Sequence, residues 1–259
     1  MEQELNLQGY RVWEVPALAA LGAPAYLSTR QGPGRPWDLR ERSGKPGAEV
    51  PDREAFLALF GFRSAAAHRP AQVHGPGVAV LGGEPGGVWP AVDGLITTAE
   101  DRPLWAFFAD CTPVFFLAPG RAIGLIHAGW RGTAAGILEA AVAAFGRLGV
   151  APQELRVYTG PHIGAECYQV GPEVKAGFLA AYPWAHEAFS PAGHLDLGRI
   201  QLGILERAGI PGDQLWSSEI CTACHTDLFY SHRREGPTAG RFGAIFWRGR
   251  KRPVLGEYF

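Results

Sequence analysis

Three residues able to bind a metal ion lie at the ends of otherwise apolar runs of the chain. His74 precedes a Gly-Pro-Gly turn, Cys111 lies between two aromatic and aliphatic runs, and His127 ends a third run. Such runs are typical of buried strands, and functional side chains tend to lie on the loops that a rigid scaffold carries. Two imidazoles and one thiolate would make a tetrahedral zinc site with one position left for water or substrate. The alternative is two core histidines and an ordinary buried cysteine.

The segment that follows the third run, HAGWRGT from His127 to Thr133, leads into a helical pattern. Its glycines would let backbone amides approach a ligand, and the start of a helix favours an anion. Arg131 could add two hydrogen bonds to a phosphate or carboxylate. A glycine-rich turn with a surface arginine would have the same sequence, so the pattern alone leaves both interpretations open.

A Cys-x-x-Cys-His string from Cys221 to His225 could tether a haem, hold half of a zinc site or do redox work. Haem attachment is disfavoured because Met1 is the only methionine, which leaves no Met axial ligand. A complete structural zinc site needs further ligands, and the sequence has no second Cys-x-x-Cys pair. In a reducing cytosol the four cysteines are expected to be thiols or metal ligands rather than disulfides.

Composition and charge argue against several classes of protein. The chain has 259 residues, of which 47% are hydrophobic and 19% charged, and its formal net charge is -1. It therefore has no general electrostatic attraction for nucleic acid or anionic lipid. The N-terminus has no basic stretch followed by an apolar one, and no apolar run approaches the roughly 20 residues of a membrane helix. We expect a soluble, cytoplasmic protein that binds neither nucleic acid nor membrane.

The apolar patterns predict short buried strands mixed with several helices. Strands are expected at residues 78–81, 94–98, 104–109, 114–117, 121–126, 156–159 and 244–247. One helix is expected with Pro51 in its first turn, and another between Thr133 as its N-cap and Gly149 as its stop. Two more helices are expected at residues 173–181 and 197–208. This order favours an α+β fold in which mixed sheets are covered by helices. No repeat, low-complexity block or long linker divides the chain, so residues 1–259 are expected to form a single layered domain.

A series of short motifs also follows along the chain: Ser28 to Gly32, Gln72 to Gly75, Asp93-Gly94, Ala109 to Pro113, His127 to Gly132, Gly160-Pro161 with Tyr168 and Gly171, Cys221-Thr222, Phe229 to Arg234, and Gly240-Arg241. In this order they resemble the YfiH/LACC1 family of laccase-domain proteins, now described as purine nucleoside phosphorylases. The resemblance covers nearly the whole chain. Cys224 and His225 lie outside the family pattern and are expected to be incidental.

Two segments depart from the family pattern. Ser-Leu-Asn-Leu is replaced by Pro36-Trp37-Asp38-Leu39, and Ser-Tyr-Arg-Arg by Ser231-His232-Arg233-Arg234. Neither departure falls on His74, Cys111 or His127.

The resemblance implies a YfiH-like domain that binds Zn²⁺ through His74, Cys111 and His127. It also implies phosphorolysis of adenosine, inosine, guanosine and methylthioadenosine to the base and ribose 1-phosphate, with adenosine deamination as a further activity. Phosphate would attack C1′ of the ribose through an oxocarbenium-like state. For deamination, zinc would lower the pKa of a bound water toward about 7, and hydroxide would attack C6 of adenine.

Four further residues are candidates for the chemistry. Phosphate needs cationic donors, for which Arg30, Arg131 and Arg233 are the candidates. Asp110, beside Cys111, could orient a histidine or move a proton, or it could make a buried structural hydrogen bond.

Other functions compete for the same residues. Cys111 as nucleophile and His127 as base would make a cysteine hydrolase that acts on a cell-wall precursor, and bacterial relatives are linked to peptidoglycan editing. A copper polyphenol oxidase, the activity behind the laccase label, would need about ten histidines in His-x-His pairs. This chain has 8 histidines and no such pair. A non-catalytic binding module is the remaining alternative.

Overall fold

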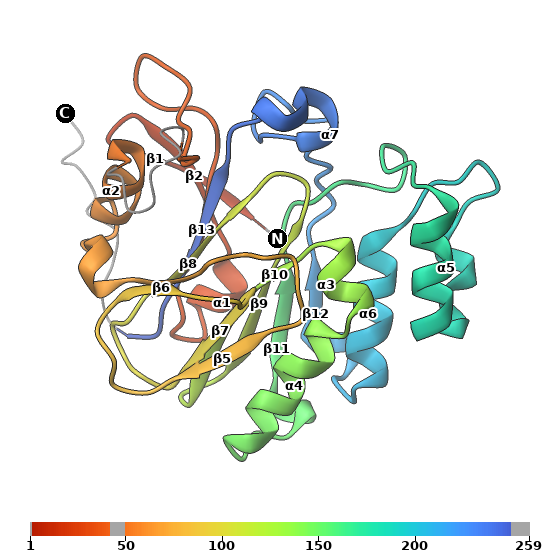
Figure 1. Ribbon diagram of the computed structural model, residues 1–259. Coiled ribbons are helices and arrows are strands. Elements are labelled where there is room, and N and C mark those ends of the chain that lie inside the picture. Colours follow the sequence, from red (N-terminus) through yellow and green to blue (C-terminus); the bar gives the residue numbers. More distant parts are fainter. Residues whose placement is uncertain (1, 42–49, 250–259) are drawn as a thin grey trace.

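Two β-sheets form the centre of the protein in the computed structural model, which describes residues 2–41 and 50–249 (Figure 1). In spatial order the first sheet contains β1 (Gln3–Leu7), β2 (Tyr10–Glu14), β3 (Ala25–Ser28), β13 (Phe242–Phe246), β8 (Leu104–Phe108), β4 (His68–Pro70) and β6 (Gly87–Trp89). The second contains β12 (Leu215–Ser217), β11 (Arg156–Thr159), β9 (Thr112–Ala118), β10 (Ala122–Ala128), β7 (Gly94–Thr97) and β5 (Val78–Leu81). Both sheets mix parallel and antiparallel pairs.

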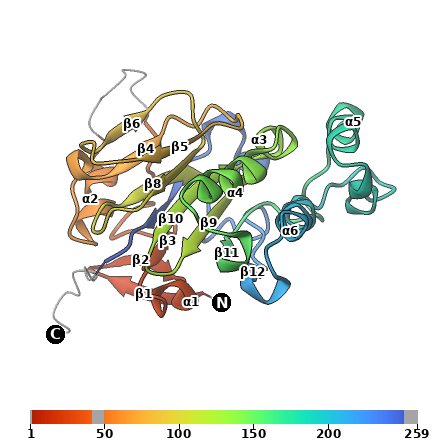
Figure 2. The same ribbon diagram turned by 90° about the horizontal axis from the view of Figure 1, so that it is seen from below.

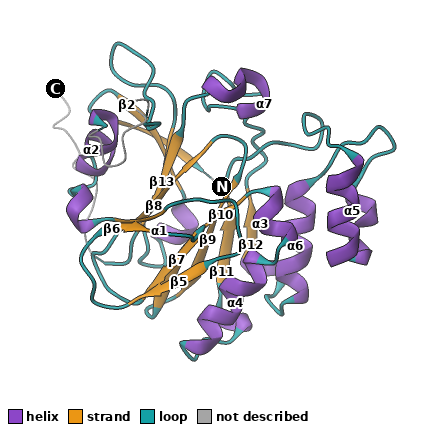
Figure 3. Ribbon diagram, in the orientation of Figure 1, coloured by secondary structure: helices purple, strands orange, loops and turns teal. Residues whose placement is uncertain are grey.

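Helices cover the outer faces of both sheets (Figures 2 and 3). The α-helices are α1 (Pro16–Ala19), α2 (Pro51–Ala58), α3 (Trp130–Ala134), α4 (Ile137–Arg147), α5 (Pro172–Ala181), α6 (Leu197–Arg207) and α7 (His232–Glu235). Short 3-10 turns lie at Ser64–Ala66, Pro152–Glu154, Pro183–Ala188, Gly212–Gln214 and Gly236–Thr238. Helix α2 packs on the first sheet, and α4 and α6 pack on the second. Within the described ranges, no helix has the length and apolar character needed to cross a membrane.

The strands read as continuous apolar runs because both of their faces are buried. Phe116 of β9 packs toward the helices, where its ring lies 5.8 Å from that of Phe145 in α4. The next residue along, Phe115, faces the other sheet and lies 5.4 Å from Phe246 of β13. A third apolar layer surrounds Phe60 between the α2 segment and the first sheet. The expected α+β arrangement of mixed sheets covered by helices is confirmed, while the expected domain of residues 1–259 includes positions outside the described ranges.

One helix start differs from the expectation. Thr133 does not cap the long helix, because it lies inside the short helix α3, whose N-cap is Gly129. Helix α4 begins only after Gly136, which has a left-handed φ of 88° that separates the two helices. Gly149, with a φ of 71°, lies just beyond the end of α4 as expected.

Candidate metal centre

His74, Cys111 and His127 come together although they lie on three separate segments. One ligand atom from each lies within 4.8 Å of the others, and the two imidazole rings are 4.9 Å apart at 82°. His74 follows β4, Cys111 lies in the turn from β8 to β9, and His127 lies near the end of β10. We call these three residues the metal cluster. The three residues that sequence analysis grouped as one candidate metal site therefore lie together in the fold.

The strand alternation explains the position of the metal cluster. Ile123 and Leu125 of β10 pack between the two sheets, so His127, two residues further on, points toward the same side. Cys111 packs against the same inter-sheet core. The turn that carries it joins β8 of the first sheet to β9 of the second. The cluster therefore lies where the chain crosses from one sheet to the other.

Asp93 organises two of the three ligands. Its fully buried carboxylate accepts a hydrogen bond from Nδ1 of His127 at 2.8 Å. The same carboxylate accepts the backbone amides of Val73, His74 and Gly75 at 2.9–3.0 Å. The bond to Nδ1 leaves Nε2 of His127 available to a metal, which is the usual carboxylate–histidine–metal arrangement.

The loops of the cluster hold unusual backbone conformations. Gln72, His74 and Asp110 have left-handed φ values of 58°, 62° and 84°. The Gln72 side chain donates to the carbonyl of Phe107 at 2.6 Å and accepts its amide at 3.0 Å, which anchors the His74 loop to β8. Non-glycine residues in this region cost free energy and are concentrated at functional sites.

Two glycines of the HAGWRG segment are required by close packing around the cluster. A Cβ on Gly129 would lie 2.8 Å from the Cys111 sulfur, and one on Gly132 would lie 2.9 Å from the carbonyl oxygen of Gly75. These glycines therefore let α3 approach the ligands. Arg131 is exposed, and its guanidinium stacks 4.4 Å from the ring centre of Trp130.

The cluster also has a distinctive charge balance. Burial alone would raise the pKa of Cys111, but His127 and His74 lower it to about 6. Burial would likewise lower the pKa of His127, but the Cys111 thiolate and Asp93 raise it to about 9. Without a metal the two groups form a thiolate–imidazolium pair. A metal ion would replace the imidazolium proton, so its binding releases a proton.

Asp110 has a different set of partners from the histidines. Its carboxylate accepts the hydroxyl of Thr222 at 2.7 Å and the backbone amide of Arg233 at 2.6 Å. These bonds tie the Cys111 turn to the segment that carries α7. The residue that orients a histidine is Asp93, which sequence reasoning noted only as part of a motif. The available signal was an acidic residue directly before an apolar strand.

The predicted arginines lie in different surroundings. Arg30 pairs with Glu235 at 3.0 Å and donates to the carbonyl of Thr226 at 2.6 Å. No contact among the described residues joins Arg30 to the metal cluster. Arg233 donates to the carbonyl of Gln169 at 2.8 Å, and its guanidinium lies 5.1 Å from the ring centre of Tyr168.

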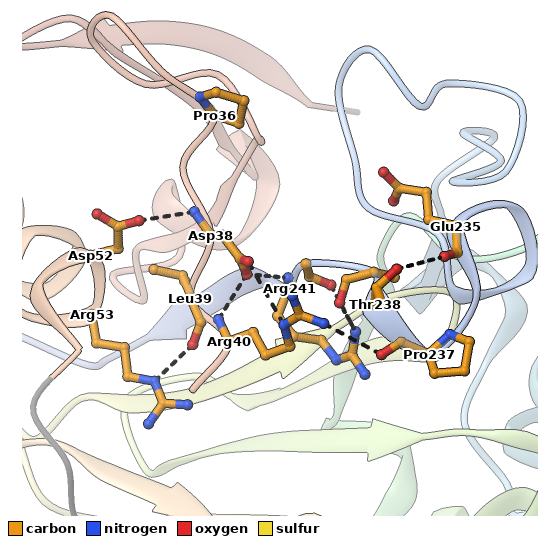
Figure 4. Close-up of polar contacts among 12 residues, drawn as sticks. Pro36, Asp38, Leu39, Arg40, Asp52, Arg53, Glu235, Pro237, Thr238 and Arg241 are labelled. Carbon is orange, nitrogen blue, oxygen red and sulfur yellow. Dashed lines mark hydrogen bonds and ion pairs between the residues drawn. The ribbon is translucent and has the colours of Figure 1, made fainter. Parts of the chain in front are cut away.

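Two other arginines, Arg40 and Arg241, were not among the candidates from sequence. Asp38 accepts the backbone amides of both, at 2.9 Å and 2.8 Å (Figure 4). Burial, and then the positive charge of Arg40, lower the pKa of Arg241, whereas the Cys111 charge opposes this effect. The Arg241 guanidinium therefore lies within electrostatic reach of both Cys111 and Arg40.

Comparison with known proteins identifies the family of this chain. Residues 38–249 match the model of a family described as multi-copper polyphenol oxidoreductase laccase. The chain belongs to this YfiH/LACC1 family. It is 35% identical over 245 residues to a purine nucleoside phosphorylase of Deinococcus radiodurans, covering 92% of this chain and 94% of that one. It is 40% identical over 168 residues, 61% of each chain, to purine nucleoside phosphorylase YlmD of Geobacillus stearothermophilus.

A solved structure supports the assignment to the YfiH/LACC1 family. The crystal structure of a Bacillus licheniformis hypothetical protein YfiH superposes with a TM-score of 0.86 at 26% identity, over 96% of this chain and 99% of that one. Within this family fold, the donors of the metal cluster fit a metal ion with one open position. Thiolate and imidazole donors select metals such as zinc and copper over magnesium and calcium.

Proposed function

We propose that this chain is a zinc-dependent purine nucleoside phosphorylase that cleaves adenosine, inosine, guanosine or methylthioadenosine with phosphate. The observation that carries the proposal is a three-ligand metal cluster with the Arg241 guanidinium within electrostatic reach of both Cys111 and Arg40. The names of the relatives, which are purine nucleoside phosphorylases, support the choice of reaction. The absence of an Asp110–histidine contact among the described residues leaves Asp93 as the residue that positions a ligand.

Arg40 and Arg241 are the best-placed residues to bind phosphate. Arg241 is held by bonds from Nη1 to the carbonyls of residues 239 and 240, at 2.7 Å and 2.8 Å. Within the described ranges, Nη1 of Arg40 makes one long bond of 3.4 Å to the carbonyl of Pro237, and its Nε lies 3.8 Å from a carboxylate oxygen of Asp38. A phosphate dianion between the two guanidinium groups would relieve their mutual repulsion and accept charge-assisted hydrogen bonds. Asp38, where the family pattern has Asn, accepts the backbone amides of Arg40 and Arg241 and so fixes the positions of both residues.

The other arginines have supporting roles in this scheme. Arg131 and Arg233 remain candidate contacts for phosphate or nucleoside at the rim of the site. The ion pair of Arg30 with Glu235 and its bond to the 226–235 segment favour a structural role.

In the proposed reaction, the bond from C1′ to the purine nitrogen breaks while a phosphate oxygen bonds to C1′. A zinc ion held by His74, Cys111 and His127 would supply Lewis acidity to the reaction. Burial, followed by the negative charge of Cys111, raises the pKa of Tyr168, so its hydroxyl keeps its proton at neutral pH. We assign to this hydroxyl a hydrogen bond to the departing purine. The purine ring nitrogen gains the proton that hydrogen phosphate gives up when it becomes the ester dianion of ribose 1-phosphate. Deamination of adenosine stays a prediction from the resemblance.

One observation favours a second candidate, a cysteine hydrolase. Cys111, His127 and Asp93 have the order of a nucleophile, a base and an orienting carboxylate, and the pKa of Cys111 is lowered to about 6. However, a ring nitrogen of His74 also lies within 4.8 Å of the Cys111 sulfur, and a metal site requires this third group whereas a nucleophile does not. Measured metal content separates the two candidates, as does alkylation of Cys111 that occurs only after chelation. A blue thiolate absorption band would instead indicate copper.

The proposal is tested by the dependence of inosine cleavage on phosphate. The zinc-loaded protein should form hypoxanthine and ribose 1-phosphate in equal amounts, and neither without phosphate. Arg241→Ala and Arg40→Ala should each raise the KM for phosphate about 10- to 100-fold, since a charge-assisted bond contributes about 1.5–3 kcal/mol. Arg121→Ala, which removes a surface pair with Glu154, is the matched control and should leave KM unchanged. Cleavage at an equal rate without phosphate would contradict the proposal.

A further inference from the structure

A second group of metal-binding side chains lies outside the metal cluster. Glu166, Cys167, Cys221 and Cys224 each offer one donor atom, and these atoms all lie within 4.8 Å of one another. The Cys167 and Cys224 sulfurs are 3.4 Å apart, and Cys224 lies 3.4 Å from a carboxylate oxygen of Glu166. We call this group the cysteine cluster, and it shares no residue with the metal cluster.

The spacing suits one tetrahedral ion. A Zn–S bond of about 2.3 Å places two thiolates on the same ion about 3.8 Å apart, which is close to the spacing observed. A disulfide could join only two of the three cysteines and would leave the third as a thiol. An iron–sulfur cluster would need wider separation, because irons and sulfides lie between its cysteine ligands.

We propose that Cys167, Cys221 and Cys224, with Glu166 as the fourth ligand, bind a structural Zn²⁺ ion. Three thiolates and one carboxylate complete the four-coordinate shell that is typical of structural rather than catalytic zinc. The sequence alone supplied only half of this site in Cys221-x-x-Cys224. The missing ligands come from Cys167 and Glu166, which precede Cys224 by 57 and 58 residues. Cys224 is therefore functional in this proposal and not incidental.

Neighbouring groups would stabilise the negative charge of the thiolates. The backbone amide of Gly164 donates to the Cys221 sulfur at 3.1 Å. A guanidinium nitrogen of Arg234 lies 3.6 Å from the Cys167 sulfur, while Nε of the same side chain donates to the carbonyl of Ala223 at 2.9 Å. Hydrogen bonds of this kind orient metal ligands and tune their basicity. Binding exchanges one Zn²⁺ for the protons of the three thiols and involves no redox change.

The ion would hold together two segments that border the metal cluster. Residues 164–169 and 221–235 meet at the cysteine cluster. Thr222 and Arg233 from the second segment bond to the Asp110 carboxylate, next to Cys111. Arg233 also donates to the carbonyl of Cys167 at 3.3 Å. The second zinc therefore stabilises the wall of the first site without taking part in the reaction.

The test is the zinc content of the full-length protein after loading and gel filtration. Wild type should hold two ions per chain, Cys224→Ser one, Cys111→Ala one, and the double variant none. Cys224 is exposed, so its replacement should leave the fold intact, as circular dichroism can verify. Glu166→Gln should still bind both ions, but the ion at the cysteine cluster should be removed by a weaker chelator than the wild type requires.

Cobalt provides a second readout, because only thiolate ligands give the intense sulfur-to-cobalt band. Three of the four cysteines lie in the cysteine cluster, so Cys111→Ala should keep about three quarters of the band and Cys224→Ser should lose more than Cys111→Ala does. Two zinc ions in Cys224→Ser, or a Cys167–Cys224 disulfide in the purified protein, would overturn the proposal. The zinc lost in Cys111→Ala reports on the proposed phosphorylase site, and the zinc lost in Cys224→Ser reports on the cysteine cluster. Each proposal can therefore fail while the other holds.

Discussion

Replacing Asp93 by asparagine should weaken zinc binding more than any other conservative change near the metal cluster. Each oxygen of Asp93 accepts two hydrogen bonds: one takes His74 N and His127 Nδ1, and the other takes Val73 N and Gly75 N. An asparagine has only one acceptor oxygen, so its NH₂ group would face two donors.

The magnitude follows from these four bonds. A hydrogen bond to a charged group contributes about 1.5–3 kcal/mol, so the loss of two amounts to about 3–6 kcal/mol before the structure relaxes. Part of this loss destabilises the His74 loop and part weakens the orientation of His127. The second part should lower zinc affinity about 10- to 100-fold, the usual effect of removing the carboxylate partner of a metal-bound histidine.

The assay is competition for zinc with a chromophoric chelator. Asp52→Asn is the matched control, because Asp52 is also a buried carboxylate but belongs to α2 and, within the described ranges, bonds to none of the three ligands. It bonds to Arg35 and to the backbone amide of Asp38. Asp52→Asn should lower stability and leave zinc affinity unchanged. In metal-free Asp93→Asn, NMR titration should find the pKa of His127 below the value of about 9, because a negative neighbour is lost. Zinc affinity within twofold of wild type would refute this reasoning.

Three further outcomes are expected. Gly129→Ala should lower zinc affinity at least tenfold, because its Cβ would lie 2.8 Å from the Cys111 sulfur. Gly146→Ala is the control, since nothing lies within 4 Å of a Cβ there; it should bind zinc normally and unfold at a slightly higher temperature. In metal-free protein, Cys111 should be alkylated with a midpoint near pH 6, since its pKa is lowered to about 6, and zinc should protect it; a midpoint at pH 8 or above would argue against the thiolate–imidazolium pair. Tyr168→Phe should lower kcat about tenfold, equivalent to one hydrogen bond of about 1.4 kcal/mol, with the KM for phosphate unchanged; an unchanged kcat would remove Tyr168 from the mechanism.

The central strands and helices could be predicted from the sequence because their signals are local. The run from residue 156 to 159 matches β11, and those at 104–109 and 173–181 match β8 and α5 within a residue at each end. Continuous apolar runs bounded by polar residues indicate strands buried on both faces. The N-terminal hairpin was missed. Its turn uses Gln8 and Gly9 with φ values of 54° and 85°, a less common pair than Asn-Gly for the same conformation.

The candidate site could be predicted only as far as its residue types. His74, Cys111 and His127 stood out because each ends an apolar run, but their partner Asp93 acquires its role only when β7 and β10 pair in the fold. Likewise, Arg40 and Arg241 become neighbours through Asp38, although 203 residues separate Asp38 from Arg241. Cys167 and Cys224 meet in the same way, across 57 residues. Contacts of this range leave no periodic signal in a single sequence.

The most direct test of the proposed function compares wild type with Cys111→Ala for ribose 1-phosphate formed from inosine and phosphate, with zinc measured on the same samples. We predict phosphate-dependent product from the wild type, and from Cys111→Ala no product and one zinc ion fewer per chain. Full phosphorolysis by Cys111→Ala protein that lacks this zinc ion would contradict the account.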